Sequence, residues 1–471
     1  MKPPTISGAR LALSLHEQQG RALLTPATEI LFGGAAGGGK SHLLRVVSIL
    51  ACMEVPGLQA YLFRRLHPDL VKNHLEGPSS YHVLLAPLVN SGRARIVEKE
   101  IRFWNGSKIY LGHLQHEKDI YSYQGQEIHM LLFDELTHFT ETMYRYLRGR
   151  CRVVGLKNVP EKWRGRLPLI ISGSNPGGVG HTWVKRTFVK NGAYRIVKTT
   201  REDGGLLRQF IPSLHSQNPY LMRDDPDYES RLHGLGDRTL VRAMLEGDWN
   251  IVAGSMFGDS WSETLHICDP FPIPEDWKIW RGGDDGFASP ASVHWFTKDP
   301  KTGTHYVIGE LYKSGMRPEL MAERVKSKDK RLQVLRHDGS EGESGRVFSG
   351  VLDNAAFADT GTQNAIPRGN AMNNLGCRWE PAEKWPGSRV ARVQHLHRML
   401  GRNPKCPRGL PSLRFFRNHA PMAVETIPTL PRDPKDPEDV DTDAEDHAFD
   451  SITYGLLWRM GGAVRVKVHG T

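Results

Sequence analysis

A glycine-rich segment near the N-terminus constrains the fold of this chain most strongly. Residues 34–41, GAAGGGKS, fit the pattern G-x-x-x-x-G-K-[ST], in which the backbone N–H groups of a loop close around phosphate oxygens. An apolar run precedes this loop and an amphipathic run follows it, so the segment predicts a strand, a phosphate-binding loop and a helix. The residues expected to bind the nucleotide phosphates and their Mg²⁺ are Gly34, Gly37, Gly39, Lys40 and Ser41.

A second apolar run, residues 128–133, ends in two carboxylates, Asp134 and Glu135. Alone, such a run is more often an edge strand with a solvated end. Together with the phosphate-binding loop it predicts that Asp134 holds Mg²⁺ through water and that Glu135 orients and deprotonates the attacking water. Adjacent Asp and Glu favour an ATP-driven motor over a small-molecule kinase.

A third apolar run, residues 167–172, leads into the polar segment 172–175, SGSN. Its polar groups could sense the γ-phosphate, with Asn175 at the nucleotide, or could form a simple strand-to-loop turn. Gln18 or Gln19 could bind adenine or lie on the surface. The loop itself contains no arginine, so an arginine finger must come from elsewhere, in cis or from a neighbouring subunit. The candidates are Arg64, Arg65, Arg148, Arg150 and Arg152.

The length of 471 residues predicts two domains, because single cores stop growing at about 250–300 residues. Residues 1–250 alternate apolar runs with helical stretches, which indicates an α/β domain with a mainly parallel sheet. The candidate strands are 30–32, 61–63, 108–111, 130–133 and 169–172. Residues 251–275 are rich in Gly, Pro and Ser and predict a linker. In residues 276–471, the runs 291–296 and 305–312 alternate like paired antiparallel strands. With a final helix from about Asp446, they indicate a second domain with a mixed sheet.

The composition excludes several classes of protein. Five widely separated cysteines lack metal-ligand spacing and indicate reduced thiols. Neither a signal peptide nor a membrane-spanning run is present in the sequence, so we expect a protein that is neither exported nor inserted in a membrane. The net charge of +10 favours a polyanionic partner.

Carboxylates in the second half fall at the ends of predicted strands or on the last helix. Carboxylates that converge from separate elements can hold two divalent ions for phosphodiester cleavage, although each one alone is more often a cap or turn residue. The acidic positions, with one neighbouring histidine, are Asp284, Asp285, Asp353, Asp446, His447 and Asp450.

A basic stretch with interleaved aromatic residues, 378–417, lies between Asp353 and the last helix. Such a stretch suits a DNA backbone that is bound without sequence preference, and Arg389 and Arg392 are two of its expected DNA contacts. The alternative is an ordinary solvated face.

With these motifs, the chain resembles the large terminase subunit of tailed bacteriophages over nearly its whole length. The stretches that carry the resemblance are FGGAAGGGKS, YLFRRLHPDL, YQGQEIHMLLFDELTHF, SGSNPGGVGHTWVKRTF, LEGDWNIVAGSMF and EDHAFDSITYGLL. The family is a two-domain ATPase–nuclease that cuts concatemeric viral DNA and drives it into an empty capsid. The resemblance therefore implies a P-loop motor domain followed by a ribonuclease H-like nuclease domain with a mixed sheet.

Residue by residue, the resemblance assigns Lys40 and Ser41 to the Walker A motif, Asp134 and Glu135 to the Walker B motif, and 172–175 to the coupling motif. Asp284 matches the first nuclease metal ligand, although Asp285 replaces the usual Trp beside it. Asp353 matches the second ligand. The third ligand is open among Asp450, which we favour, Asp446 and His447, and Glu310 lies where a further acidic ligand is sometimes seen. The expected catalytic residues are Glu135, Asp284, Asp353 and Asp450.

The resemblance also implies cofactors and partners. ATP and Mg²⁺ are the expected cofactors, with Mn²⁺ able to substitute at the nuclease site. The expected partners are double-stranded DNA, a small terminase subunit and the portal protein, with a homo-oligomeric ring acting on a procapsid in the host cytoplasm. Two alternatives stay open: a helicase–nuclease of DNA repair, and an assembly scaffold that only binds ATP.

Overall fold

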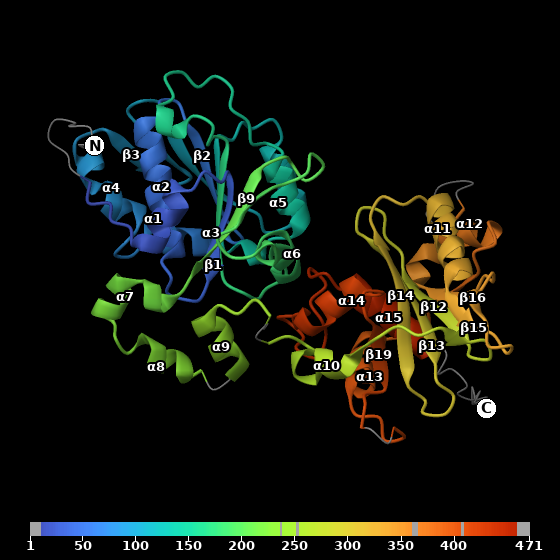
Figure 1. Cartoon of the computed structure of the whole chain (residues 1–471). Coiled ribbons are helices and arrows are strands. Elements are labelled where there is room, and N and C mark those ends of the chain that lie inside the picture. The colour runs from blue at the N-terminus through green and yellow to red at the C-terminus, as the bar shows by residue number, and fades with distance from the viewer. Residues whose placement is uncertain (1–10, 236–237, 251–253, 360–365, 407–408, 459–471) are drawn as a thin grey trace, which may run out of the picture. The chain divides into compact units, whose positions relative to one another are not determined.

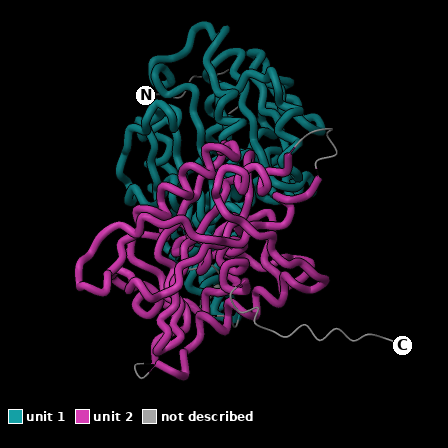
Figure 2. The backbone as a smooth tube through the Cα atoms, turned by 90° about the vertical axis from the view of Figure 1, so that its right-hand side faces the viewer, with its two compact units in different colours: residues 1–253 teal, residues 254–471 magenta. Residues whose placement is uncertain are grey.

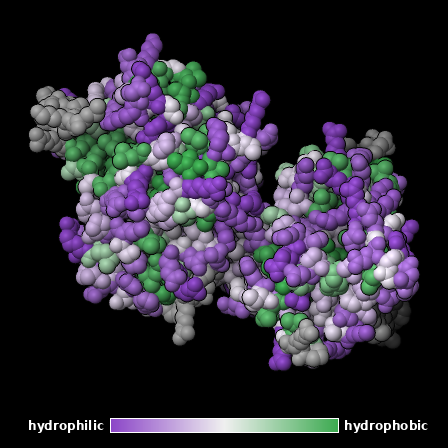
Figure 3. Space-filling model, viewed as in Figure 1, coloured by the Kyte–Doolittle hydropathy of each residue, from purple (hydrophilic) through white to green (hydrophobic). Residues whose placement is uncertain are grey.

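The chain divides into two compact units, residues 1–253 and 254–471 (Figure 2). The structure is a computed structural model that describes residues 11–235, 238–250, 254–359, 366–406 and 409–458. Across the described part of the chain, no helix is both long and apolar enough to span a bilayer. The visible face of both units is mainly hydrophilic, with scattered apolar patches (Figure 3).

A nine-stranded sheet forms the centre of unit 1, in the order β3-β4-β5-β2-β6-β7-β1-β9-β8. The six strands from β5 to β9 in this order pair in parallel. The antiparallel strands β3, β4 and β8 lie at the two edges. The predicted α/β domain with a mainly parallel sheet is therefore confirmed.

The unit 1 strands are β1 Glu29–Gly34, β2 Gln59–Arg64, β3 Ala94–Val97, β4 Glu100–Phe103, β5 Lys108–His113, β6 Met130–Asp134, β7 Leu169–Ser174, β8 Ile196–Lys198 and β9 Leu207–Ser213. Its α-helices are α1 Glu17–Leu24, α2 Lys40–Glu54, α3 His67–Leu70, α4 Tyr81–Asn90, α5 Glu141–Arg148, α6 His181–Thr187, α7 Pro219–Asp224, α8 Tyr228–His233 and α9 Arg238–Glu246.

Helices cover both faces of this sheet because its central strands alternate two sets of apolar side chains (Figure 1). Ile30 and Phe32 of β1 pack with the residues of α2 and α4, whereas Leu31 packs with those of α5 and α6. Strands buried on both sides read as continuous apolar runs, which explains why the sequence pattern located β1, β2, β5, β6 and β7.

Unit 2 contains a seven-stranded mixed sheet in the order β10-β19-β14-β13-β12-β17-β18. β12 pairs antiparallel with β13 and β13 with β14, while β17 is parallel to β12 and β18 to β17. β14 pairs in parallel with β19. The predicted mixed sheet of the second domain is therefore confirmed, including the antiparallel pair formed by the runs 291–296 and 305–312.

The unit 2 strands are β10 Ile267–Cys268, β11 Ile273–Pro274, β12 Ile279–Asp284, β13 Ala291–Lys298, β14 His305–Lys313, β15 Gln333–Leu335, β16 Glu341–Glu343, β17 Gly350–Leu352, β18 Trp379–Pro381 and β19 Leu413–Phe416. Its α-helices are α10 Glu263–His266, α11 Pro318–Arg331, α12 Arg368–Asn374, α13 Ser388–Leu400, α14 Pro421–Thr426 and α15 His447–Trp458.

The segment expected to be a linker, 251–275, contributes to unit 2 from residue 254 onward. It carries α10, β10 and β11, and β10 pairs in parallel with β19 of the main sheet. Its Gly, Pro and Ser residues separate these very short elements, which are too short to give a periodic apolar pattern. Whether the two units correspond to an ATPase and a nuclease domain with the predicted limits stays a prediction.

Helix α15 packs directly on strand β12 at Gly282. A Cβ atom at Gly282 would lie 2.1 Å from the carbonyl oxygen of Ser451 and 2.6 Å from the backbone nitrogen of Gly455. The indole Nε1 of Trp280 donates to the carbonyl oxygen of Gly455 at 2.8 Å. This close approach sets the distance between Asp284, at the end of β12, and the polar residues of α15.

Replacing Gly282 with alanine is expected to destabilise unit 2. The added methyl group must push α15 away from β12, and overpacking of this kind costs about 1–3 kcal/mol. The free energy of unfolding, measured by denaturant titration with tryptophan fluorescence, should fall by about that amount. Gly20→Ala in α1 is the control, because a Cβ there meets nothing within 4 Å. Equal stabilities for Gly282→Ala and the unmodified chain would contradict this packing.

Candidate functional site

The glycine-rich loop of unit 1 is braced from outside by side chains that bind its carbonyl oxygens. Gln19 of α1 donates to the Gly39 oxygen at 2.7 Å, and Ser213 of β9 donates to the Gly38 oxygen at 2.7 Å. Asn218 donates to the Gly37 oxygen at 2.8 Å. Gly37 and Gly39 have positive φ angles of 73° and 79°, which glycine adopts without strain.

Lys40, Ser41 and Asp134 meet at the carboxyl ends of β1 and β6. The Ser41 hydroxyl donates to Asp134 Oδ1 at 3.0 Å, and Lys40 Nζ donates to the carbonyl oxygen of Ala35 at 2.7 Å. Burial lowers the pKa of Lys40, against the opposing charges of Glu135 and Asp134. A lysine that is held only by a carbonyl oxygen of its own loop is suited to exchange that partner for a phosphate.

The carboxylate of Asp134 is almost completely buried, with 1% of its surface exposed. Burial alone would raise its pKa, but the hydrogen bond from His74, the charge of Arg64 and the Ser41 hydroxyl together hold the pKa below its usual range. Asp134 is therefore ionised and can hold a cation beside Ser41. A hydroxyl and a carboxylate are oxygen donors of the kind that Mg²⁺ prefers.

Glu135, the second carboxylate, has a left-handed backbone, with φ 58° and ψ 62°. This conformation is unusual for a residue with a side chain and occurs mainly at functional sites. Glu135 lines a cavity of about 560 Å³ together with Lys40, Ser41 and Asn175. The four residues predicted from three separate motifs thus share one cavity.

The polar segment that follows β7 is connected to the segment that follows β6. The hydroxyl of Ser174 accepts the backbone N–H of Thr137 at 3.0 Å and lies 2.9 Å from the Thr137 hydroxyl. Asn175 Oδ1 is buried without a hydrogen-bond partner in the described structure. A change at Asn175 can therefore pass to the residues beside Glu135 through a short chain of hydrogen bonds.

The two glutamines and the arginine candidates are also placed by the structure. Gln19 braces the loop, and Gln18 accepts from the Tyr194 hydroxyl at 3.3 Å. Among the arginines, Arg64 lies at the site, with Nη1 3.3 Å from Asp134 Oδ2. The other four have contacts elsewhere: Arg65 with Met143, Arg148 with Glu29, Arg150 with Tyr146 and Arg152 with Glu127.

In unit 2, carboxylates from three elements gather around Asp284. His447 Nδ1 lies 2.9 Å from Asp284 Oδ2. Burial, together with the charges of Asp450 and Asp353, raises the pKa of Asp284 to about 6, against the opposing hydrogen bond from His447. Burial and the charge of Asp450 also raise the pKa of Asp446. The ends of β12 and β17 and the start of α15 thus form one acidic cluster.

Basic side chains bind most of these carboxylates. Lys384 Nζ lies 2.7 Å from Asp353 Oδ1. Arg392 donates to Asp450 Oδ1 at 2.7 Å. A third cation, from Arg389 on α13, donates to Asp446 Oδ2 at 2.8 Å. Within the described ranges, no three His, Cys, Asp or Glu side chains are already arranged to hold a metal ion. The oxygen donors fit Mg²⁺ or Mn²⁺ in kind.

Arg389 and Arg392 therefore do not have the role that the charge pattern suggested. Both were expected to contact DNA, but Arg392 is buried and both bind carboxylates of the acidic cluster. The cause is tertiary packing, because α13 lies against α15 and turns these two side chains inward.

Asp285 and Glu310 lie outside the acidic cluster. Asp285 binds Arg368 through two hydrogen bonds of 2.6 and 2.9 Å, which supports Asp284 as the functional member of the pair. Glu310 does not match its expected role as a further ligand, because its oxygens accept the backbone N–H groups of Met422 and Ala423 at the start of α14. It also lies 3.1 Å from His294 Nε2.

Two residues at these sites were missed by the sequence analysis. His74 binds Asp134 in unit 1, and Lys384 binds Asp353 in unit 2. His74 belongs to no motif that we recognised. Lys384 lay within the basic stretch, but its pairing with a carboxylate could not be read from the charge pattern.

Three solved structures that align with the chain have low sequence identity to it. The large terminase of a thermophilic bacteriophage is 14% identical, covering 94% of this chain and 98% of that chain with a TM-score of 0.39. The HK97 bacteriophage large terminase is 10% identical, covering 91% of each chain with a TM-score of 0.43. The nuclease domain of the bacteriophage SPP1 large terminase, solved with bound Mn, is 17% identical, covering 42% of this chain and 98% of that domain with a TM-score of 0.29.

The sequence comparisons concern mainly unit 1. A comparison with curated protein sequences finds no match. Residues 26–227 match the profile of a family described as "Phage terminase large subunit". This range contains the phosphate-binding loop, Asp134, Glu135 and Asn175. It confirms the predicted resemblance, through residues 26–227, of this chain to the phage terminase large subunits.

Proposed function

We propose that this protein is an ATP-hydrolysing motor that packages double-stranded viral DNA, and that its second unit cuts the DNA with bound divalent metal ions. The observation that carries the proposal is the single cavity that brings Lys40, Ser41, Glu135 and Asn175 together. The family match supports the motor, and the acidic cluster around Asp284 supports the nuclease.

In the proposed ATPase, Lys40 leaves the carbonyl oxygen of Ala35 and neutralises the β- and γ-phosphates. Ser41 and Asp134 would hold the Mg²⁺ that accompanies the nucleotide, which would supply positive charge beside the transferred phosphoryl group. Glu135 orients and deprotonates the attacking water. The hydrogen bonds between Asn175, Ser174 and Thr137 offer a path from the γ-phosphate to neighbouring elements.

In the proposed nuclease, Asp284, Asp353 and a third residue at or just before the start of α15 would hold divalent ions. Asp450 is favoured as that residue, with Asp446 and His447 as the alternatives. Mg²⁺ or Mn²⁺ would supply charge stabilisation and an activated water for phosphodiester cleavage. Lys384, Arg389 and Arg392 offset the repulsion among the carboxylates when no metal is bound.

By resemblance, the protein acts in the host cytoplasm as a ring of subunits on a procapsid, with the portal protein and a small terminase subunit as partners. A helicase–nuclease would instead separate the strands of a forked duplex without packaging. An assembly scaffold would support packaging without hydrolysing ATP.

Glu135→Ala is expected to retain ATP and to lower the hydrolysis rate by about 10²–10⁴-fold, because it removes the general base. Steady-state phosphate release and equilibrium binding of a fluorescent ATP analogue measure the two effects. The control is Glu127→Gln, because the partly exposed carboxylate of Glu127 pairs with Arg152. Packaging by the Glu135→Ala variant at the unmodified rate would favour the scaffold and contradict the motor.

Asp284→Ala and Asp353→Ala are expected to abolish plasmid cleavage in Mn²⁺ or Mg²⁺ while ATP hydrolysis survives. Asp285→Asn is the control, because Asp285 binds Arg368 outside the acidic cluster. Chelation of the metal with EDTA should stop cleavage by the unmodified chain. The assignment of the site would be contradicted if both alanine variants cleave the plasmid at full rate. It would also be contradicted if the Asp285→Asn variant loses as much cleavage activity as the alanine variants do.

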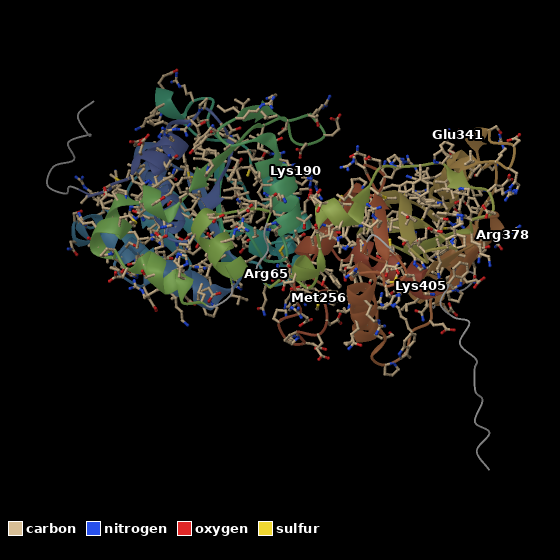
Figure 4. All side chains as sticks on the ribbon, turned by 60° about the horizontal axis from the view of Figure 1, so that its bottom comes forward. Arg65, Lys190, Met256, Glu341, Arg378 and Lys405 are labelled. Atoms are coloured by element: carbon tan, nitrogen blue, oxygen red, sulfur yellow. The ribbon has the colours of Figure 1, made fainter. Side chains whose placement is uncertain are left out.

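Exposed cations on unit 2 are expected to carry DNA binding in place of Arg389 and Arg392. Arg378, Arg398 and Lys405 are exposed, and Arg378 lies at the edge of the unit in Figure 4, where Lys405 is also labelled. Charge reversal at Arg398 and Lys405 should weaken DNA binding. The slope of the logarithm of the binding constant against the logarithm of the salt concentration should become shallower by about one for each lost phosphate contact. Arg417→Glu is the control, because Asp269 already neutralises Arg417. An unchanged slope in the double variant would contradict a DNA contact.

A further inference from the structure

His74 is a fully buried histidine whose two ring nitrogens both contact charged side chains at the nucleotide site. It lies in the short π-helical segment Val71–Leu75, which follows α3, and none of its surface is exposed. Its Nε2 lies 3.0 Å from Asp134 Oδ2, and its Nδ1 lies 3.3 Å from Arg45 Nη1. Single π-helical turns occur frequently at functional sites.

The contact with Arg45 determines which ring nitrogen carries the proton. A guanidinium group can only donate hydrogen bonds, so Nδ1 of His74 must accept. In the neutral ring the proton is therefore on Nε2, which donates to Asp134.

Arg45 is itself held in place. It lies on α2, the helix that begins at Lys40, and only 4% of its surface is exposed. Its Nη1 donates to the carbonyl oxygen of Asn73 at 2.7 Å, and its Nη2 donates to the Ser79 hydroxyl at 3.0 Å. The helix that follows the phosphate-binding loop thus fixes the position of the imidazole ring.

The two oxygens of Asp134 consequently have different partners. Oδ1 accepts from the Ser41 hydroxyl at 3.0 Å, and Oδ2 accepts from His74 Nε2 at 3.0 Å. A carboxylate with one oxygen fixed by a buried donor cannot rotate freely, so its other oxygen stays directed at Ser41. Partners that orient a metal ligand in this way affect metal affinity by about 10–100-fold.

We propose that His74 is a positioning residue of the nucleotide site: its Nε2–H fixes the carboxylate of Asp134 so that Oδ1 faces Ser41, where Mg²⁺ is held with the nucleotide. The inference rests on the proposed ATPase function. Arg45 takes part by setting the tautomer and the orientation of the ring.

Two amide substitutions separate this role from simple packing. In His74→Gln, the amide nitrogen can take the place of Nε2 and donate to Asp134. In His74→Asn, the shorter amide reaches only the place of Nδ1. The control is His129→Gln, because His129 is buried in the same unit, and its Nδ1 accepts from the backbone N–H of Gln59 away from the nucleotide site.

The experiment measures binding of a fluorescent ATP analogue by the full chain in EDTA and then across a Mg²⁺ titration, with the ATP hydrolysis rate followed in parallel. The His74→Asn variant is expected to raise the Mg²⁺ midpoint about tenfold, while its affinity for the analogue in EDTA stays within about twofold of the unmodified chain. His74→Gln should restore the midpoint to within about threefold, and His129→Gln should not shift it.

The proposal is overturned if His74→Asn has the unmodified midpoint, or if His74→Gln is shifted as much as His74→Asn. Should His74→Asn fail to fold, His74→Leu, which has no donor, takes its place with the same expected shift. The proposed function itself would be overturned if the unmodified chain neither binds the analogue nor hydrolyses ATP at any Mg²⁺ concentration.

Discussion

The nucleotide site of unit 1 depends on the buried carboxylate of Asp134. It lies at the carboxyl end of β6 and joins the phosphate-binding loop, through Ser41, to a separate segment of the chain, through His74. Burying a charge is costly unless the charge is paired and hydrogen-bonded, and here both oxygens have donors. In the sheet order β6-β7-β1, only β7 lies between the strand that ends in this carboxylate and the strand that leads into the loop. The packing of these three strands therefore also places the residues of the site.

In unit 2, carboxylates that lie close together are stabilised by basic side chains. Its acidic cluster gathers like charges, and cations from the segment before α15 bind them individually. Truncating one partner of such a buried pair leaves an uncompensated charge. The cations therefore stabilise the metal-free cluster, and they also compete with a metal ion for the same oxygens.

The sequence predicted those parts of the structure that depend on local pattern. The buried strands β1, β2, β5, β6 and β7 read as apolar runs, and the loop at Gly34 has a specific spacing. The short edge strands β3, β4 and β8 were not predicted, because three or four residues with exposed polar side chains give no clear periodicity. The elements within 254–275 were not predicted for the same reason, since α10, β10 and β11 are each only two to four residues long.

The partners of charged residues could not be predicted from the sequence. Arg389 and Arg392 bind carboxylates 57 and 58 positions later in the chain, and a basic stretch gives no sign of which side chains turn inward. His74 is separated from Asp134 by 60 positions, and only the folded chain brings the two together. In contrast, Asp353 could be proposed because it ends the apolar run 347–352, and Asp284 because its segment, GGDDGFASP, resembles the start of the family's nuclease domain.

The most direct test of the central claim is a crystal structure of the chain with Mg²⁺ and a non-hydrolysable ATP analogue. The account predicts Mg²⁺ at about 2.0–2.1 Å from the Ser41 hydroxyl oxygen, with Asp134 Oδ1 directed at the ion or its water. It also predicts that Lys40 Nζ moves from the Ala35 carbonyl oxygen to the phosphates. A nucleotide bound elsewhere, or a Lys40 that keeps its contact with Ala35 beside the bound nucleotide, would contradict the account.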